Sequence, residues 1–265
     1  VRAQASVGKS GDERQSVHVT VDGTKVVAGG DIELRAYNEG AALANIVRGT
    51  NISLGAVDVE ELPTYGWYAT GVDVKGQAEL ISENGNVNIL SEDDMSGESV
   101  ARGTTIGIGF NVSTTYGRNE AYGTNTINVD GILDAYASLI VKAASRANLK
   151  AETYADGGGL ISGVGLKATN KLERTVAVNL LQGSSLSANF GDVDILATAG
   201  GEDTIVTTSK ITSGGLVAEG TANVDIQLTS NVTVNLEEGV EILDRFNTLN
   251  VKAEASQNGV NTTVS

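Results

Sequence analysis

Residues 18–23 read HVTVDG, and this short strand pattern ending in a glycine turn returns four more times along the chain. The later copies are GVDVKG (71–76), INVDG (127–131), VNLLQG (178–183) and VNLEEG (234–239). Their glycines, from Gly23 to Gly239, follow one another at nearly equal intervals. A nearly fixed period of roughly 54 residues indicates a repeat architecture, so it guides the interpretation of the whole chain.

Two further elements keep the same register. The second strand pattern occurs as DIELRA (31–36), NVNILS (86–91), LIVKAA (139–144), DVDILA (192–197) and TLNVKA (248–253). The third, glycine-rich element occurs as VRGTNISLG (47–55), ARGTTIGIG (101–109), GGGLISGVG (157–165) and SGGLVAEGT (213–221). These elements predict full repeats at 23–75, 76–130, 131–182 and 183–238, with partial repeats at 1–22 and 239–265. Both ends stop in mid-pattern, so we expect 1–265 to be a single solenoid segment cut from a longer chain.

Within each repeat the apolar residues alternate with polar ones. Val17, Val19 and Val21 show this period of two, which together with glycine turns predicts strands. The stretch 144–155 has a helical composition, but it stands where other repeats have strands, so we interpret it as strand and loop. In this register Ile32, Val87, Val193 and Leu249 are predicted to occupy equivalent inward positions.

A repeat of about 54 residues cannot bury its apolar face alone, whereas stacked repeats bury a continuous core. Glycine-rich, aliphatic repeats favour an all-β solenoid, a right-handed parallel β-helix with coils about 4.8 Å apart. With coils of ordinary size, each repeat would supply two or three of them. The alternatives are a string of small β-sandwiches, which would be marginal at this size, and another all-β fold.

The segments GDVDILATAGG (191–201) and ITSGGLVAEGTANVDIQLTSNVTVNLEEGVEIL (211–243) resemble the repeats of very large bacterial filamentous adhesins, the haemagglutinin-like and leukotoxin-type exported proteins. The resemblance extends in style over nearly the whole chain. It implies a secreted or cell-surface β-helical stalk that takes part in attachment, and it supplies no catalytic residues.

Composition excludes several functions. Acids outnumber bases by 33 to 18, a net charge of −15. This predicts no nucleic-acid partner, because phosphates would stay unneutralised, and no adsorption to an anionic membrane. No apolar run approaches the roughly 18 residues that a membrane helix needs, so we expect no direct membrane insertion. The chain has no cysteine and one histidine, His18. Thiolate and multi-histidine metal sites are therefore impossible, and alternation predicts an exposed, structural role for His18.

Acidic clusters occur at 58–61, at 92–94 and at 237–238. If they converged with an arginine or lysine on adjacent coils, the chain would be a β-helical polysaccharide-acting enzyme of the lyase type. The calcium nonapeptide repeat and the EF-hand loop are both missing. We therefore expect no cofactor and no catalytic residue, with a structural calcium ion only as an alternative.

Two repeats carry aromatic residues where the others have none. The segment 60–71 contains Tyr65, Trp67 and Tyr68, and 114–125 contains Tyr116 and Tyr122. We interpret both segments as inserted loops on one side of the solenoid. Exposed aromatics at such a place are typical of protein contacts and of sugar platforms, although they also serve to cover coil edges.

Together these observations predict a structural stalk or adhesion segment of a large exported bacterial surface protein. Its expected partners are surface glycans or proteins, contacted weakly through the five aromatic residues, and neighbouring repeats of the same parent chain. The lyase-like enzyme remains the alternative function.

Overall fold

The computed structural model describes residues 2–10, 14–43, 47–243 and 245–265, with side chains described for 15–40, 63–243 and 245–265. The described residues form strands and turns without any helix, which confirms the all-β class. No membrane-spanning helix therefore occurs among them. The strands are β1 (Arg2–Ser10), β2 (Arg14–Asp22), β3 (Lys25–Ala28), β4 (Ile32–Leu43), β5 (Val47–Ser82), β6 (Val87–Ala135), β7 (Leu139–Gly158), β8 (Ile161–Leu180), β9 (Ser185–Ala188), β10 (Val193–Ala199), β11 (Thr204–Gly214), β12 (Val217–Leu236), β13 (Glu241–Ile242), β14 (Leu249–Ala255) and β15 (Val260–Val264).

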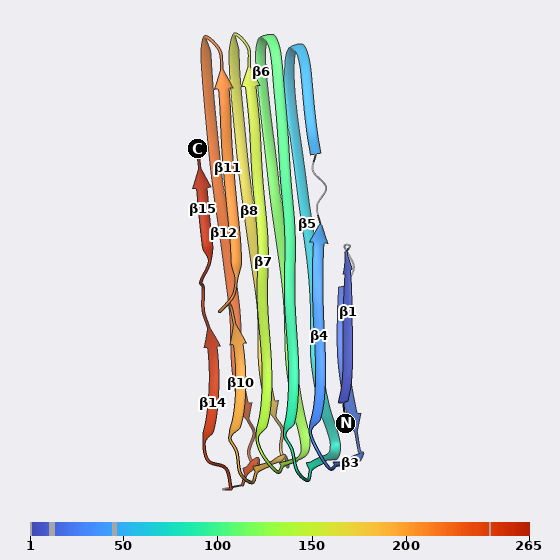
Figure 1. Cartoon of the computed structure of the whole chain (residues 1–265). Coiled ribbons are helices and arrows are strands. Elements are labelled where there is room, and N and C mark those ends of the chain that lie inside the picture. The colour runs from blue at the N-terminus through green and yellow to red at the C-terminus, as the bar shows by residue number, and fades with distance from the viewer. Residues whose placement is uncertain (1, 11–13, 44–46, 244) are drawn as a thin grey trace.

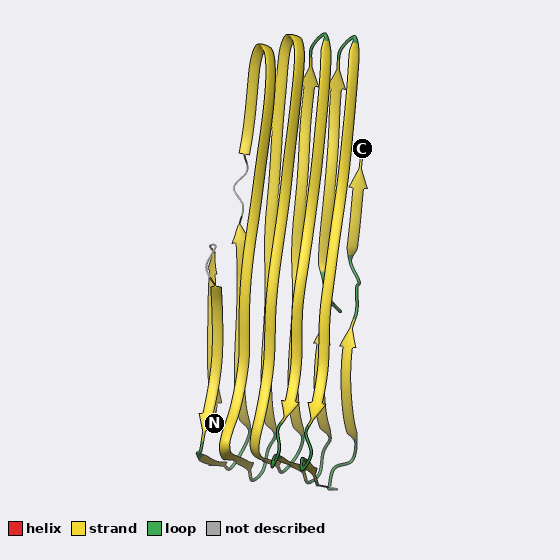
Figure 2. Cartoon of the chain, turned by 180° about the vertical axis from the view of Figure 1, so that it is seen from behind, coloured by secondary structure: helices red, strands yellow, loops and turns green. Residues whose placement is uncertain are grey.

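The chain runs in tall, flat circuits that lie side by side (Figures 1 and 2). Each circuit has a first arm, a second arm returning beside it, and a short base strand. β7 is a first arm, β8 is a second arm and β9 is a base strand. β6 holds all three parts, at 87–106, 110–129 and 131–135, because it bends at each corner without losing its strand pairing.

Neighbouring circuits pair in parallel at equivalent positions. Ile32 pairs with Val87, Val87 with Leu139, Leu139 with Val193 and Val193 with Leu249. The chain thus completes one circuit on the way from each of these residues to the next. The expectation of two or three coils per repeat is therefore wrong. The reason is arm length: β7 and β8 have 20 residues each, or about 66 Å at 3.3 Å per residue.

The first circuit is shorter than the others. Arg2 of β1 pairs with Glu33 of β4, a smaller step along the chain than between any later pair of first arms. β2 pairs with β5 from Arg14 opposite Trp67 to Asp22 opposite Lys75. The upper part of β5 therefore has a described neighbour on one side only, namely β6.

The main apolar core lies at the base, where the two arm layers and the base strands meet. Ile32, Val87 and Val193 are fully buried there, as the alternation predicts. Leu249 holds the same register but is exposed, because β14 is the outer strand of the described sheet. The stretch 144–155 is strand throughout, within β7, so the expected strand is confirmed and the expected loop is wrong.

The recurrent glycines allow the chain to turn from second arm to base. Gly76 has φ +64°, and three of its four counterparts likewise have positive φ, which favours glycine. The fourth, Gly131, is restricted by space, since a Cβ there would lie 2.2 Å from the carbonyl oxygen of Ala78.

Above the base the interior alternates between apolar clusters and polar levels. One level contains an amide chain: Asn119 Nδ2 donates to Asn170 Oδ1 at 2.9 Å, and Asn170 Nδ2 donates to Thr207 Oγ1 at 2.8 Å. Another contains the buried ion pair of Arg174 with Asp203, with N–O distances of 3.0 and 2.6 Å. Such groups are tolerated in an interior when hydrogen bonds satisfy them.

Asp93 is one of several buried polar side chains that have no hydrogen-bond partner among the described residues, and it is a carboxyl group. It is 2% exposed, and neither carboxyl oxygen has a hydrogen-bond partner among the described residues. Burial, reinforced by the charge of Asp94, raises the pKa of Asp93 from 3.8 to about 8, although Arg174 acts in the opposite direction. Asp93 therefore holds its proton at neutral pH.

The two faces of one strand can be compared directly. Leu139→Asn places an amide among the fully buried side chains of the base core, so it should lower the free energy of unfolding by about 3 kcal/mol or more. Ile140→Asn, on the outer face, should cost about 1 kcal/mol or less. Urea denaturation measures both, and equal losses would contradict the register.

Asp93→Asn should change how stability depends on pH. The folded state keeps the Asp93 proton up to about pH 8, while the unfolded state releases it near pH 4, so this group lowers stability as pH rises from 4 to 8. The substituted amide cannot ionise, so the variant should gain a few kcal/mol over wild type at pH 8 and little at pH 4. Asp192→Asn, at an exposed position, is the matched control. A variant destabilised at pH 8 would contradict the burial argument.

Candidate functional site

The aromatic segments are strands, so the expectation of inserted loops is wrong. Residues 60–71 belong to β5, and 114–125 belong to β6. Pro63 fits a strand here because β2 begins opposite Trp67, which leaves this part of β5 as an edge in the described structure. Proline is accepted at such edges, since its missing N–H removes no ladder bond.

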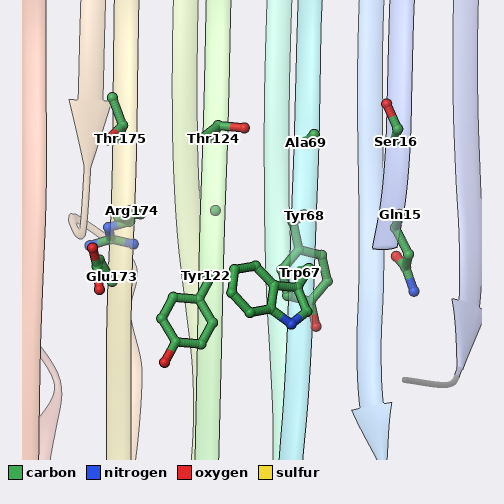
Figure 3. A pocket seen from close by; sticks show the side chains of 11 residues that line it. Gln15, Ser16, Trp67, Tyr68, Ala69, Tyr122, Thr124, Glu173, Arg174 and Thr175 are labelled. Carbon is green, nitrogen blue, oxygen red and sulfur yellow. The ribbon is translucent and has the colours of Figure 1, made fainter. Parts of the chain in front are cut away.

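Strand alternation places Trp67 on the outer face of the second arms, 41% exposed. Tyr122 is the residue paired with it on the next circuit. The two rings stack with centroids 4.2 Å apart and planes 13° from parallel. Figure 3 shows the rings side by side on the strand surface. They form a stacked aromatic pair that extends over two circuits, which we call the platform.

Polar groups surround the Tyr122 end of this platform. Tyr122 Oη donates to Glu120 Oε2 at 2.5 Å, and Lys171 Nζ donates to Tyr122 Oη at 3.1 Å while lying 5.0 Å from the ring centroid. The bond to the Glu120 carboxylate is the main reason that the pKa of Tyr122 is raised. Glu120 also pairs with Arg118, and Lys171 lies 3.8 Å from Glu173. The phenol stays protonated and in a fixed orientation.

A groove of about 530 Å³ runs beside the platform. Its outer-face floor is a row of small residues in register on four circuits, namely Ser16, Ala69, Thr124 and Thr175. The platform residues Trp67 and Tyr122, followed by Glu173, form one side. A shallow groove with an aromatic side and hydroxyl groups on its floor suits a flat, polar ligand.

An asparagine ladder lies on the same outer face. Asn235 Nδ2 donates to Asn179 Oδ1, Asn179 donates to Asn128, and Asn128 donates to Asp73, at 2.7, 2.8 and 2.8 Å. The carboxylate of Asp73 ends the ladder 3.7 Å from His18 Nδ1. Asp73 lies six positions after Trp67 along β5, a distance of about 20 Å at the rise of a strand. The ladder therefore lies on the same face as the groove, about 20 Å towards the base.

The structure separates the five predicted aromatic residues. Trp67 and Tyr122 stack, and Tyr65 lies next to them, half-buried and paired with Glu120. Tyr68 belongs to the interior instead: it is 4% exposed, and its hydroxyl donates to the carbonyl of Ser96 at 3.1 Å. Tyr116 is half-buried and lines a separate, charged pocket.

Carboxylates were expected to converge if the chain were a lyase-like enzyme. A groove of about 580 Å³ on the first arms contains Glu92, Glu202 and Glu254 together with basic residues. Two of its carboxylates are already paired, since Arg35 pairs with Glu92, and Arg146 pairs with Glu202 at 2.8 Å and with Asp94 at 3.0 Å. In the part of the chain that the structure describes, no three acidic or histidine side chains are arranged to hold a metal ion.

The other candidates take separate positions. His18 is exposed, as alternation predicts, and 237–238 lie in the exposed turn after β12. The side chains of the cluster at 58–61 lie outside those that the structure describes.

Comparison with protein-family models, curated proteins and solved structures finds no significant match.

Sequence reasoning missed the residues that frame the platform, above all Glu120, Lys171 and the threonines of the floor. A signal for them exists in the repeat itself. Residues one repeat apart are stacked, and Trp67 and Tyr122 hold the same position on adjacent circuits. The signal was hidden because the two aromatic segments were interpreted as loops, for which no register applies.

Adjacent residues provide the matched test of this placement. Tyr68→Ala should lower the free energy of unfolding by about 3 kcal/mol, because a buried ring and its hydrogen bond are lost. Trp67→Ala should cost about 1 kcal/mol, the value of an exposed ring stack. Thermal and urea unfolding measure both, and a larger loss for Trp67→Ala would mean that the platform is structural cover.

Proposed function

We propose that this chain is a stalk and adhesion segment of a large exported bacterial surface protein. We further propose that it is a right-handed β-helix with a repeat of about 54 residues, and that it binds a surface glycan weakly along the groove beside Trp67 and Tyr122. The observation that carries the glycan proposal is the stacked pair of rings, of which Trp67 is exposed and Tyr122 is half-buried.

The chemistry of the site supports a sugar ligand. Pyranose rings have apolar C–H faces that pack on aromatic rings and hydroxyls that need hydrogen-bond partners. The platform supplies the flat face, while Lys171, Glu173 and the hydroxyl of Thr124 supply donors and acceptors at its border. Because the groove is open and shallow, each segment would bind weakly, and affinity would come from several such sites acting together.

The stalk role rests on the parallel stacking of circuits. Each circuit pairs along both long arms with the next one, so the architecture extends by addition of equivalent circuits. The resemblance of 191–201 and 211–243 to filamentous adhesin repeats supports export and a surface location.

A glycan array followed by titration calorimetry on the best ligand tests the binding proposal. The double variant Trp67→Ala with Tyr122→Ala should lose at least tenfold in affinity. Tyr136→Ala is the matched control, because Tyr136 belongs to another exposed ring pair, with Phe190, at 4.9 Å. Unchanged binding by the double variant would overturn the platform, and release of new reducing ends from a polysaccharide would favour the lyase-like alternative.

A further inference from the structure

Each first arm bends into its second arm at a tip (Figure 1, top). These tips carry exposed apolar side chains. Ile108 is 77% exposed and Phe110 is 57% exposed in β6. In the turn from β7 to β8, Leu160 and Ile161 are also exposed, and so is Leu216 between β11 and β12. We call the segments 104–111, 157–163 and 213–218 the apolar tip.

These side chains recur at one position of consecutive circuits. Phe110 pairs with Ile161, and Ile161 pairs with Val217, so the three form a row across the stack. Val217 and Leu216 belong to the outer described circuit, where exposure is general. The circuits that contain Ile108 and Leu160 have paired neighbours on both sides. The side chains of Ile108 and Leu160 are therefore exposed because they lie at the tip, and not because a neighbouring circuit is missing.

The apolar tip is also free of charge. No Asp, Glu, Lys or Arg occurs within 103–117, 157–166 or 211–218, although 19% of the chain is charged. Contiguous apolar surface without charge is rare on soluble proteins unless something binds it. The recurrence of this pattern on three circuits therefore points to an apolar surface that the tip contacts.

A row of basic and aromatic side chains runs just below the tip. Arg102, Tyr154 and Lys210 pair in register on three circuits of the first arms. The guanidinium carbon of Arg102 lies 4.7 Å from the centroid of Tyr154. Four residues separate Arg102 from Ile106, about 13 Å along a strand. Aromatic and basic residues at this distance from an apolar end are typical of the headgroup region of a membrane.

We propose that the apolar tip inserts into the surface of an electrically neutral lipid bilayer, with the row of Arg102, Tyr154 and Lys210 at the level of the headgroups. Asp156 and Glu219 are the nearest acids, and they limit insertion to the uncharged turn, within the roughly 5–10 Å depth of interfacial segments. The expectation of no insertion rested on the lack of an apolar run long enough for a membrane helix, which an interfacial ridge does not need. The net charge of −15 does not oppose insertion here, because none of it lies in the tip.

A second copy of the chain is a poorer occupant for this surface. The tip is a convex ridge one turn wide, and its three circuits are about 10 Å from first to last. Such a ridge buries far less than the roughly 800 Å² per partner of a stable interface. Bilayer lipid can follow a convex ridge, whereas a protein partner would need a matching groove.

Flotation with phosphatidylcholine vesicles tests the proposal. Wild-type protein should float with the vesicles, and the triple variant Ile108→Ser, Leu160→Ser, Leu216→Ser should float at least tenfold less. The control variant Val27→Ser with Phe190→Ser removes exposed apolar side chains near the base and should float like wild type. Circular dichroism and melting verify that each variant is folded.

A tryptophan placed at the tip gives a second measurement. In Phe110→Trp with Trp67→Phe the only tryptophan reports on the tip, so its emission should shift to the blue on vesicle addition and be quenched by brominated lipid. Absence of both flotation and the shift would overturn the proposal. So would a dimer in sedimentation velocity that the triple variant abolishes, since this would assign the tip to a second copy.

Discussion

Parallel pairing between equivalent positions of successive circuits is the interaction on which this structure depends. Each circuit lies about 4.8 Å from the next, so every side chain has its repeat counterpart as a direct neighbour. Val87, for example, lies between Ile32 and Leu139. Shape and chemistry must therefore match along rows that cross the strands. The fold selects for rows of aliphatic residues in the base core, and for rows of amides or matched charges both in the interior of the arms and on their outer faces.

The same constraint explains the polar interior. Arms of about 20 residues are too long to be filled by large aromatic side chains from a chain with so few of them. Small polar residues take their place, and most of them bond along the stack, as Asn119 bonds to Asn170. Where such bonding fails, as at Asp93, the group stays neutral through its raised pKa. Gly123 belongs to the same level, since a Cβ there would lie 2.7 Å from Met95 Sδ.

Much of the base could be predicted from the sequence, because valine alternation and positive-φ glycines leave few choices there. The inward positions of Ile32, Val87 and Val193 are confirmed. The arms could not be predicted as continuous strands, since buried residues such as Asn119 and Asn170 interrupt the apolar alternation. The aromatic residues of the site could be found by their rarity. The stacking of Trp67 on Tyr122 depends on strand register, which a loop interpretation removes.

The direction of the backbone hydrogen bonds has a mechanical consequence. Within each arm these bonds run across the strands, along the direction in which circuits are added. Tension applied along that direction would pull one circuit away from the next. The hydrogen bonds between two paired strands would resist this tension together only while the strands stay parallel, since otherwise they would break one after another. Tension along an arm would instead shear a whole row of paired residues at once, as between β8 and β12. A protein with this architecture is therefore anisotropic as a material, strongest along its strands and separable between its layers.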